Sequence, residues 1–178
     1  MTMTKTVLRQ VLQQVGDIEK VDVLVGIPTF NNAATVGAVV NAVKAGIRKV
    51  CPQASVLVVN ADAGSQDGTS DTIIHTMGSD LSTVCIQHLE GGVFPGPIAL
   101  QALSESGVPG REHAFQAFFT IAEALQAKAC VVIDANLRSF TSEWMEVLLY
   151  PVLEKGVDYV APLFCRARYE GSVTNCII

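Results

Sequence analysis

Asp134 and Asn136 are the residues of this chain whose types and spacing best suit the binding of a metal ion. They follow the apolar run Val131, Val132 and Ile133, which predicts a buried strand. On an extended backbone, side chains two residues apart point to the same side. Carboxylate and amide oxygens suit hard cations such as Mg²⁺, which usually keeps substrate phosphates as further ligands. The spacing therefore favours a cation and phosphate site, although a carboxylate after a strand also commonly caps a turn.

A second polar segment, residues 62–69, reads Asp-Ala-Gly-Ser-Gln-Asp-Gly-Thr. Two glycines, two carboxylates and two hydroxyls in eight residues suit a loop that closely surrounds a ligand. The same composition equally suits a plain turn in which Asp67 or Thr69 caps the following helix.

A third segment, residues 26–32, reads Gly-Ile-Pro-Thr-Phe-Asn-Asn. An apolar strand that ends in proline before a helix leaves free backbone amides, and Phe30 can face a planar ring. The alternative is an ordinary turn between a strand and a helix, with Asn31 or Asn32 as the N-cap.

Strands and helices that alternate along the chain must position these segments. Apolar residues at helical spacing predict helices, and short β-branched runs predict strands. The predicted helices cover 5–15, 36–50, 73–77, 114–125 and 142–153, and the predicted strands cover 21–27, 55–59, 82–88, 129–134 and 157–161. This alternation is typical of right-handed crossover units, and therefore of an α/β fold with a doubly wound, mainly parallel sheet and flanking helices. Ligands bind such sheets at the carboxyl ends of the strands, where the loops 28–32, 60–68 and 134–138 are expected to converge.

The composition excludes several classes of protein. The 178 residues are 49% hydrophobic and 16% charged, so we expect one folded domain over 1–178, with residues 1–20 as a leading helical segment. A net charge of −5 without a basic cluster argues against nucleic-acid binding. Five cysteines without a paired spacing indicate reduced thiols and no zinc site. Neither a signal peptide nor a membrane span is recognisable, which favours a cytoplasmic protein.

The order and spacing of the three polar segments resemble the N-terminal, nucleotide-sugar-binding part of a glycosyltransferase with the GT-A fold. The matching segments are Ile27–Asn32, Asp62–Thr69 and Asp134–Asn136, the last one resembling the D-x-D motif. Two further stretches, Gly110–Ala114 and Tyr159–Asn175, are similar to segments of the bacterial glucosyl-3-phosphoglycerate and mannosylglycerate synthases. The resemblance covers nearly the whole chain from Val21 onward.

This resemblance implies transfer of a sugar from a nucleoside diphosphate sugar, with Mg²⁺ or Mn²⁺ as the cofactor. It implies that the nucleoside pocket is lined by Pro28, Thr29, Phe30 and Asn31, with Ala63 and Gly64 beneath the base. Asp62 is expected among the residues that bind the nucleotide sugar. Arg111 is expected near the diphosphate. The ribose, diphosphate and cation are expected to face Asp134, Ala135 and Asn136. The resemblance assigns no catalytic residue, and because relatives often pair, a homodimer is a candidate assembly.

Four positions depart from the family pattern. Asn136 replaces the last carboxylate of D-x-D, and Asn32 replaces an acidic residue. Arg111 replaces a lysine, and Glu112 replaces a glycine. An amide brings no negative charge, so we expect weakened metal binding.

The other readings of the sequence belong to different classes. The chain ends in an apolar run, 174–178, which predicts a truncated domain that lacks the acceptor-binding part. With the substitutions, this keeps open a non-catalytic nucleotide-sugar-binding domain or an inactive fragment. A nucleotidyltransferase normally carries a basic, glycine-rich signature after its first strand, and a dinucleotide oxidoreductase carries G-x-G-x-x-G. Neither signature occurs in this chain.

Overall fold

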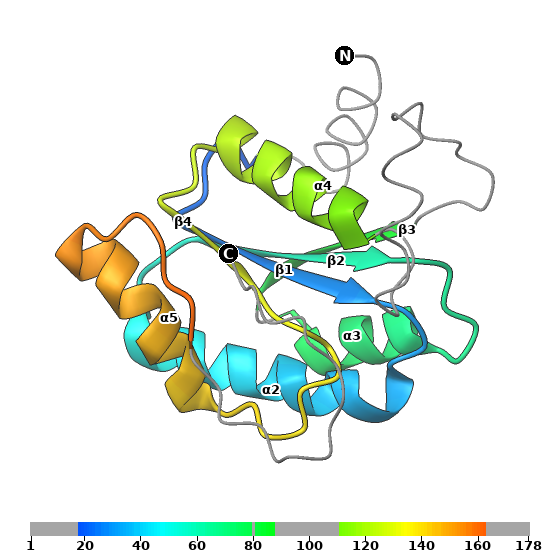
Figure 1. Cartoon of the computed structure of the whole chain (residues 1–178). Helices are drawn as coiled ribbons and strands as arrows, with labels where there is room; N and C mark the ends of the chain where they lie inside the picture. Colours follow the sequence, from blue (N-terminus) through cyan, green and yellow to red (C-terminus); the bar gives the residue numbers. More distant parts are fainter. Residues whose placement is uncertain (1–17, 80, 88–110, 163–178) are drawn as a thin grey trace.

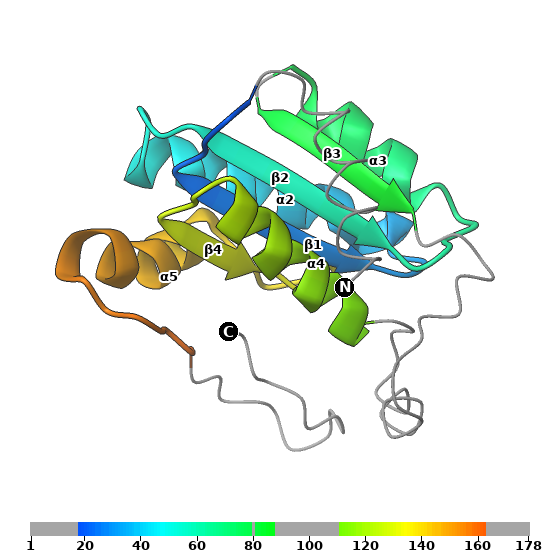
Figure 2. The ribbon, with the colours of Figure 1, turned by 90° about the horizontal axis from the view of Figure 1, so that it is seen from above.

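The core of the protein is a sheet of four parallel strands in the order β3-β2-β1-β4 (Figures 1 and 2). The computed structural model describes residues 18–79, 81–87 and 111–162. The strands are β1 Val23–Thr29, β2 Val56–Asp62, β3 Ser82–Gln87 and β4 Ala129–Val132. The helices are α2 Ala33–Val50, α3 Thr69–Met77, α4 Arg111–Ala124 and α5 Ser142–Lys155. The predicted α/β fold with a parallel sheet is confirmed.

Helices cover both faces of this sheet, so the fold is doubly wound (Figure 1). On one face α2, α3 and α5 pack against alternate residues of the strands, including Val25 and Val58. On the other face α4 places Phe118 and Ile121 against Leu24 and Leu57. Every residue of β1 and β2 is buried, which explains why these strands are almost continuously apolar rather than alternating.

Strand β1 is longer than predicted, because it runs through Pro28 to Thr29. Proline is unusual within a central strand, since it cannot donate a hydrogen bond to a neighbour. In β1 the backbone N–H and C=O groups of the even-numbered residues point toward β4, as the bond from Ile133 N to Gly26 O shows. The register between the two strands ends at Gly26 and Val132. Pro28 therefore lies beyond the end of β4, where no donor is required.

Strand β2 also runs further than predicted, through Asn60 to Asp62. The expectation of a loop from residue 60 is wrong for these three residues. Asn60 is fully buried and Asp62 is 2% exposed. The Asp62 carboxylate accepts bonds from Thr29 and Ser65, and Asn60 Nδ2 donates to Ile27 O and Thr29 Oγ1, which compensates these groups for the loss of water. Asn60 Oδ1 is buried without a hydrogen-bond partner among the described residues.

The predicted strand at 157–161 does not form, so this expectation is also wrong. These residues follow α5 without joining the sheet, and Val157 and Tyr159 are exposed. Among the described residues, β4 therefore has a strand on one side only. The predicted helix at 5–15 lies outside the described residues. In the part of the chain that is described, no helix is both long and apolar enough to span a membrane.

Candidate functional site

The point where the winding of the sheet reverses lies between β1 and β4. The chain proceeds from β1 outward to β2 and β3, and then returns to the other side of β1 as β4. Neighbouring loops leave in opposite directions at such a switch point, and ligands of open α/β sheets bind in the resulting crevice. The turns 30–32 and 133–137 border it, and the turn 63–68 lies beside them after β2. We call these three turns the rim.

Hydrogen bonds join the turn after β1 to the turn after β2 and to the start of α3. Asn31 N donates to Ser65 Oγ at 2.8 Å, and Gln66 N donates to Asn31 Oδ1 at 3.0 Å. Asn32 N donates to Thr69 Oγ1 at 2.8 Å. Asn31 has a φ of 54°, a left-handed conformation that asparagine tolerates better than most residues. Asn31, expected to face the nucleoside, thus uses its side chain to hold the next turn.

Asp67 connects the N-termini of two helices. Its Oδ2 accepts a hydrogen bond from Ala33 N, the first residue of α2, at 3.0 Å. Its Oδ1 accepts from Thr69 N, the first residue of α3, at 3.1 Å, and from the Thr69 hydroxyl. The Thr69 hydroxyl and the amide of Ala33 hold the pKa of Asp67 below its ordinary value. Asn32 occupies the N-cap position of α2, but its side chain makes no capping bond to the helix, so Asp67 caps both helices.

Asn32 instead joins the turn after β1 to the turn after β4. Its Nδ2 group donates to Asn136 Oδ1 at 2.7 Å, and its Oδ1 accepts from Phe30 N at 2.7 Å. The residue is 5% exposed. The two positions at which amides replace the acidic residues of the family pattern are therefore bonded to each other across the crevice.

The turn after β4 is organised by Asp134. Its Oδ1 accepts from Asn136 N at 2.9 Å, and its carbonyl oxygen accepts from Leu137 N at 3.3 Å. Strand β4 ends at Val132, so this segment is a closed turn rather than the extended backbone that the spacing suggested. Asp134 caps that turn, and the intervening Ala135 is buried.

A buried polar network supports the rim from below. Thr29 Oγ1 donates to Asp62 Oδ1 at 2.8 Å, and Ser65 N donates to Asp62 Oδ2 at 2.8 Å. Asn60 Nδ2 donates to Thr29 Oγ1 at 2.8 Å and to Ile27 O at 3.0 Å. Thr29 and Asp62, predicted as ligand contacts, therefore use these groups to fix the ends of β1 and β2. Sequence reasoning missed Asn60, because an amide inside a strand carries no signal of its distant partners.

The other predicted residues take different places. Phe30 and Gly64 are half-buried in the rim, and Gly64 has a φ of 91°. Ala63 N donates to Thr29 O at 2.9 Å, and Pro28 is buried. Arg111 is the first residue of α4, and its side chain lies outside the described part. The structure thus brings the three predicted segments together.

Side chains that could hold a cation are few. Within 18–79, 81–87 and 111–162, no group of three or more His, Cys, Asp or Glu residues forms a prebuilt metal site. The turn after β4 offers two side-chain oxygen donors, the Asp134 carboxylate and the Asn136 carbonyl. This set fits a Mg²⁺-type ion, which is commonly held by one or two protein oxygens together with substrate phosphates.

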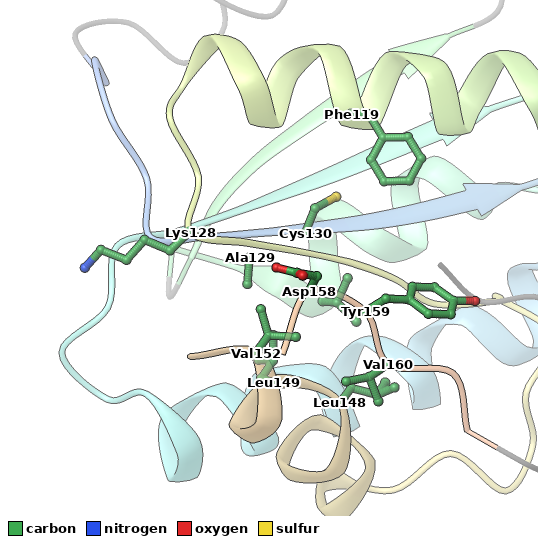
Figure 3. A pocket seen from close by; sticks show the side chains of 11 residues that line it. Phe119, Lys128, Ala129, Cys130, Leu148, Leu149, Val152, Asp158, Tyr159 and Val160 are labelled. Carbon is green, nitrogen blue, oxygen red and sulfur yellow. The ribbon is translucent and has the colours of Figure 1, made fainter. Parts of the chain in front are cut away.

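A cavity of about 200 Å³ lies beside β4 and away from the rim (Figure 3). Phe119 reaches toward it from α4, while Leu149 and Val152 line it from α5. Burial raises the pKa of the Cys130 thiol in its wall to about 12. No residue of the rim lines this cavity, and a thiol that stays protonated is a poor nucleophile.

Comparisons with known proteins found similarities only among solved structures. No family model and no curated protein matches the chain. Among solved structures, the mannosyl-3-phosphoglycerate synthase of Rubrobacter xylanophilus is 21% identical over 83% of this chain and 39% of its own, with a TM-score of 0.46. The glucosyl-3-phosphoglycerate synthase of Mycobacterium tuberculosis, in complex with Mn²⁺, UDP and glucosyl-3-phosphoglycerate, is 21% identical over 79% of this chain and 44% of its own, with a TM-score of 0.47.

A mannosyltransferase of Pyrobaculum calidifontis, in complex with GDP-Man and Mn²⁺, is 18% identical over 76% of this chain and 35% of its own, with a TM-score of 0.42. The chain spans less than half of the length of each of these three proteins.

Proposed function

We propose that the rim binds a nucleoside diphosphate sugar and that the chain is the donor-binding part of a glycosyltransferase. One observation carries this proposal. The three segments whose sequences resemble the donor-binding motifs meet at the switch point of the sheet and are hydrogen-bonded to one another there.

The proposed roles follow from the positions of the side chains. Phe30, half-buried beside the crevice, would contact the base, and Gly64 allows a close approach of backbone to ligand. The diphosphate would lie near Asp134 and Asn136. Mg²⁺ or Mn²⁺ would be held by these two residues and by phosphate oxygens, and it would neutralise charge on the departing diphosphate.

Nucleotide titration tests this proposal. We expect UDP or GDP to bind the protein in the presence of Mn²⁺, measured by calorimetry. Asp134→Ala should weaken this binding by about tenfold or more, as for the loss of one contact to a charged group. Asp158→Ala, which removes an exposed carboxylate beside the distant cavity, should leave it unchanged. Absence of binding by both nucleotides would contradict the proposal.

Transfer itself needs a second measurement. Release of nucleoside diphosphate from a nucleotide sugar would support a transferase, whereas binding without release would identify a donor-binding domain that lacks catalysis. A cytoplasmic location and a homodimer stay predictions from the sequence.

A further inference from the structure

The bond between Asn32 and Asn136 has a defined direction. Asn32 Oδ1 accepts from Phe30 N, so its Nδ2 group must face Asn136 Oδ1. If the Asn32 amide were flipped, its Oδ1 would face Asn136 Oδ1, and its Nδ2 group would face the Phe30 N–H, so neither contact would be a hydrogen bond. Because Asn32 is 5% exposed, water has little access to replace either bond. The amide of Asn32 is therefore held at both of its polar atoms.

This bond belongs to a chain of contacts that reaches the carboxylate of the crevice. The side chain of Asn136 accepts from Asn32, and the backbone N–H of the same residue donates to Asp134 Oδ1. Displacing Asn32 would therefore disturb the turn that orients Asp134. The two turns lie 104 residues apart in the sequence, so this bond links segments that are distant along the chain.

Both members of the bonded pair are neutral. Two carboxylates at the same separation would repel each other, and one of them would have to bind a proton or a cation. An amide donor facing an amide acceptor needs neither. The arrangement across the switch point is thus complete without a bound ion.

We infer that the Asn32–Asn136 pair does the organising work of a cation in this crevice, so that a nucleoside diphosphate binds the rim in the absence of divalent metal. The choice of ligand rests on the proposed function. Asn32 acts here as a positioning residue, because it holds the turn of Asp134 and contacts no reacting atom. A divalent ion held by Asp134, Asn136 and the phosphates would add to this binding without being required for it.

Titration of UDP and GDP in the presence of EDTA tests the inference on the unaltered protein. We expect a dissociation constant within about tenfold of the value with Mn²⁺, because an ion that is not required for binding should add about as much as one contact to a charged group. Binding that occurs only with Mn²⁺ would overturn the inference and leave the proposed function standing. Absence of binding under both conditions would overturn both.

The double variant Asn32→Asp/Asn136→Asp supplies the matched test. Its two carboxylates face each other, so nucleotide binding in EDTA should fall and Mn²⁺ should restore it. Each single variant keeps an amide that can donate to its partner. The loss in the double variant should therefore exceed the product of the single losses by about tenfold, as expected for coupled neighbours. Independent effects of the two substitutions would contradict the inference.

If the double variant folds poorly in EDTA, its thermal unfolding midpoint with and without Mn²⁺ provides a second test. Mn²⁺ should raise the unfolding midpoint of the double variant by more than that of the unaltered protein, because only the variant has a pair of carboxylates at positions 32 and 136 for an ion to bridge. An equal rise in the two proteins would count against the inference.

Discussion

Asp67 organises two turns of the rim, although no contact with the ligand is proposed for it. Its two oxygens accept hydrogen bonds from the first amides of α2 and α3. Each helix N-terminus carries a partial positive charge, which favours an anion at this position. The sequence correctly suggested Asp67 as a cap for α3. It could not reveal the bond to Ala33, 34 residues away, because nothing in the local pattern records which turns become neighbours.

The contribution of Asp67 should depend on pH. Its pKa in the folded protein lies below the ordinary value because of the bonds from Thr69 and Ala33. The stabilisation is therefore fully present above roughly pH 4 and is lost as the pH falls through the lowered pKa. Asp67→Ala should lower the thermal unfolding midpoint at pH 7, and the difference from the unaltered protein should shrink toward pH 3.

Asp71→Ala is the control for this prediction, because Asp71 is an exposed carboxylate in the first turn of α3, one of the two helices that Asp67 caps. It should have a smaller effect at pH 7. A difference for Asp67→Ala that is independent of pH would show that its ionised form is not what stabilises the turns.

At the scale of elements, the packing of α2 against α5 is set by a glycine. A Cβ atom on Gly46 would lie 2.5 Å from Met145 Cβ and 2.7 Å from the backbone oxygen of Ser142. Neither neighbour can move without shifting α5. On the same helix, a Cβ atom on Gly37 would lie 3.5 Å from Thr72 Cγ2, an ordinary contact.

Alanine at these two glycines should therefore have opposite effects. Gly46→Ala should reduce the free energy of unfolding by about 1–3 kcal/mol, as for an overpacked core. Gly37→Ala should increase it by up to about 1 kcal/mol, since alanine favours the helix. Urea unfolding of the two variants measures both changes. A stabilising Gly46→Ala would show that α5 can move away without cost.

Most elements were predictable because their apolar residues recur at the period of a helix or a strand. The errors occurred where a strand carries polar residues, or where apolar residues lie outside the sheet. Asp62 and the Nδ2 group of Asn60 are accommodated in β2 because they bond to Thr29 and Ser65. Val157 and Tyr159 alternate like strand residues, but they find no strand partner among the described residues. For Asn60 and Asp62, distant partners overrode the local pattern.

At the scale of the whole molecule, exposed apolar side chains flank the side of β4 that has no strand partner among the described residues. Phe119 is 37% exposed and Tyr159 is 47% exposed, and both line the cavity in Figure 3. Exposed apolar residues beside a strand with one open side favour association with another chain. The homodimer predicted from the sequence would have a suitable surface here.

Self-association at this surface should be measurable by sedimentation. We expect the average mass to rise with protein concentration, and Phe119→Glu should weaken the association by about tenfold, as for one interface anchor. Ile74→Glu is the control, because Ile74 is 55% exposed on α3, away from the residues that line this cavity. An equal effect of both variants, or a mass independent of concentration, would place the contact elsewhere or exclude it.

The order of the strands also determines when the rim can first exist during synthesis. Strands β1 and β2 are joined through α2 alone, so they can pair soon after they leave the ribosome. Strand β4 must pair with β1 across more than a hundred residues, and closing such a long loop is slow. The bond between Asn32 and Asn136 therefore forms late, and a nascent chain shorter than 136 residues has no complete crevice with which to capture a nucleotide.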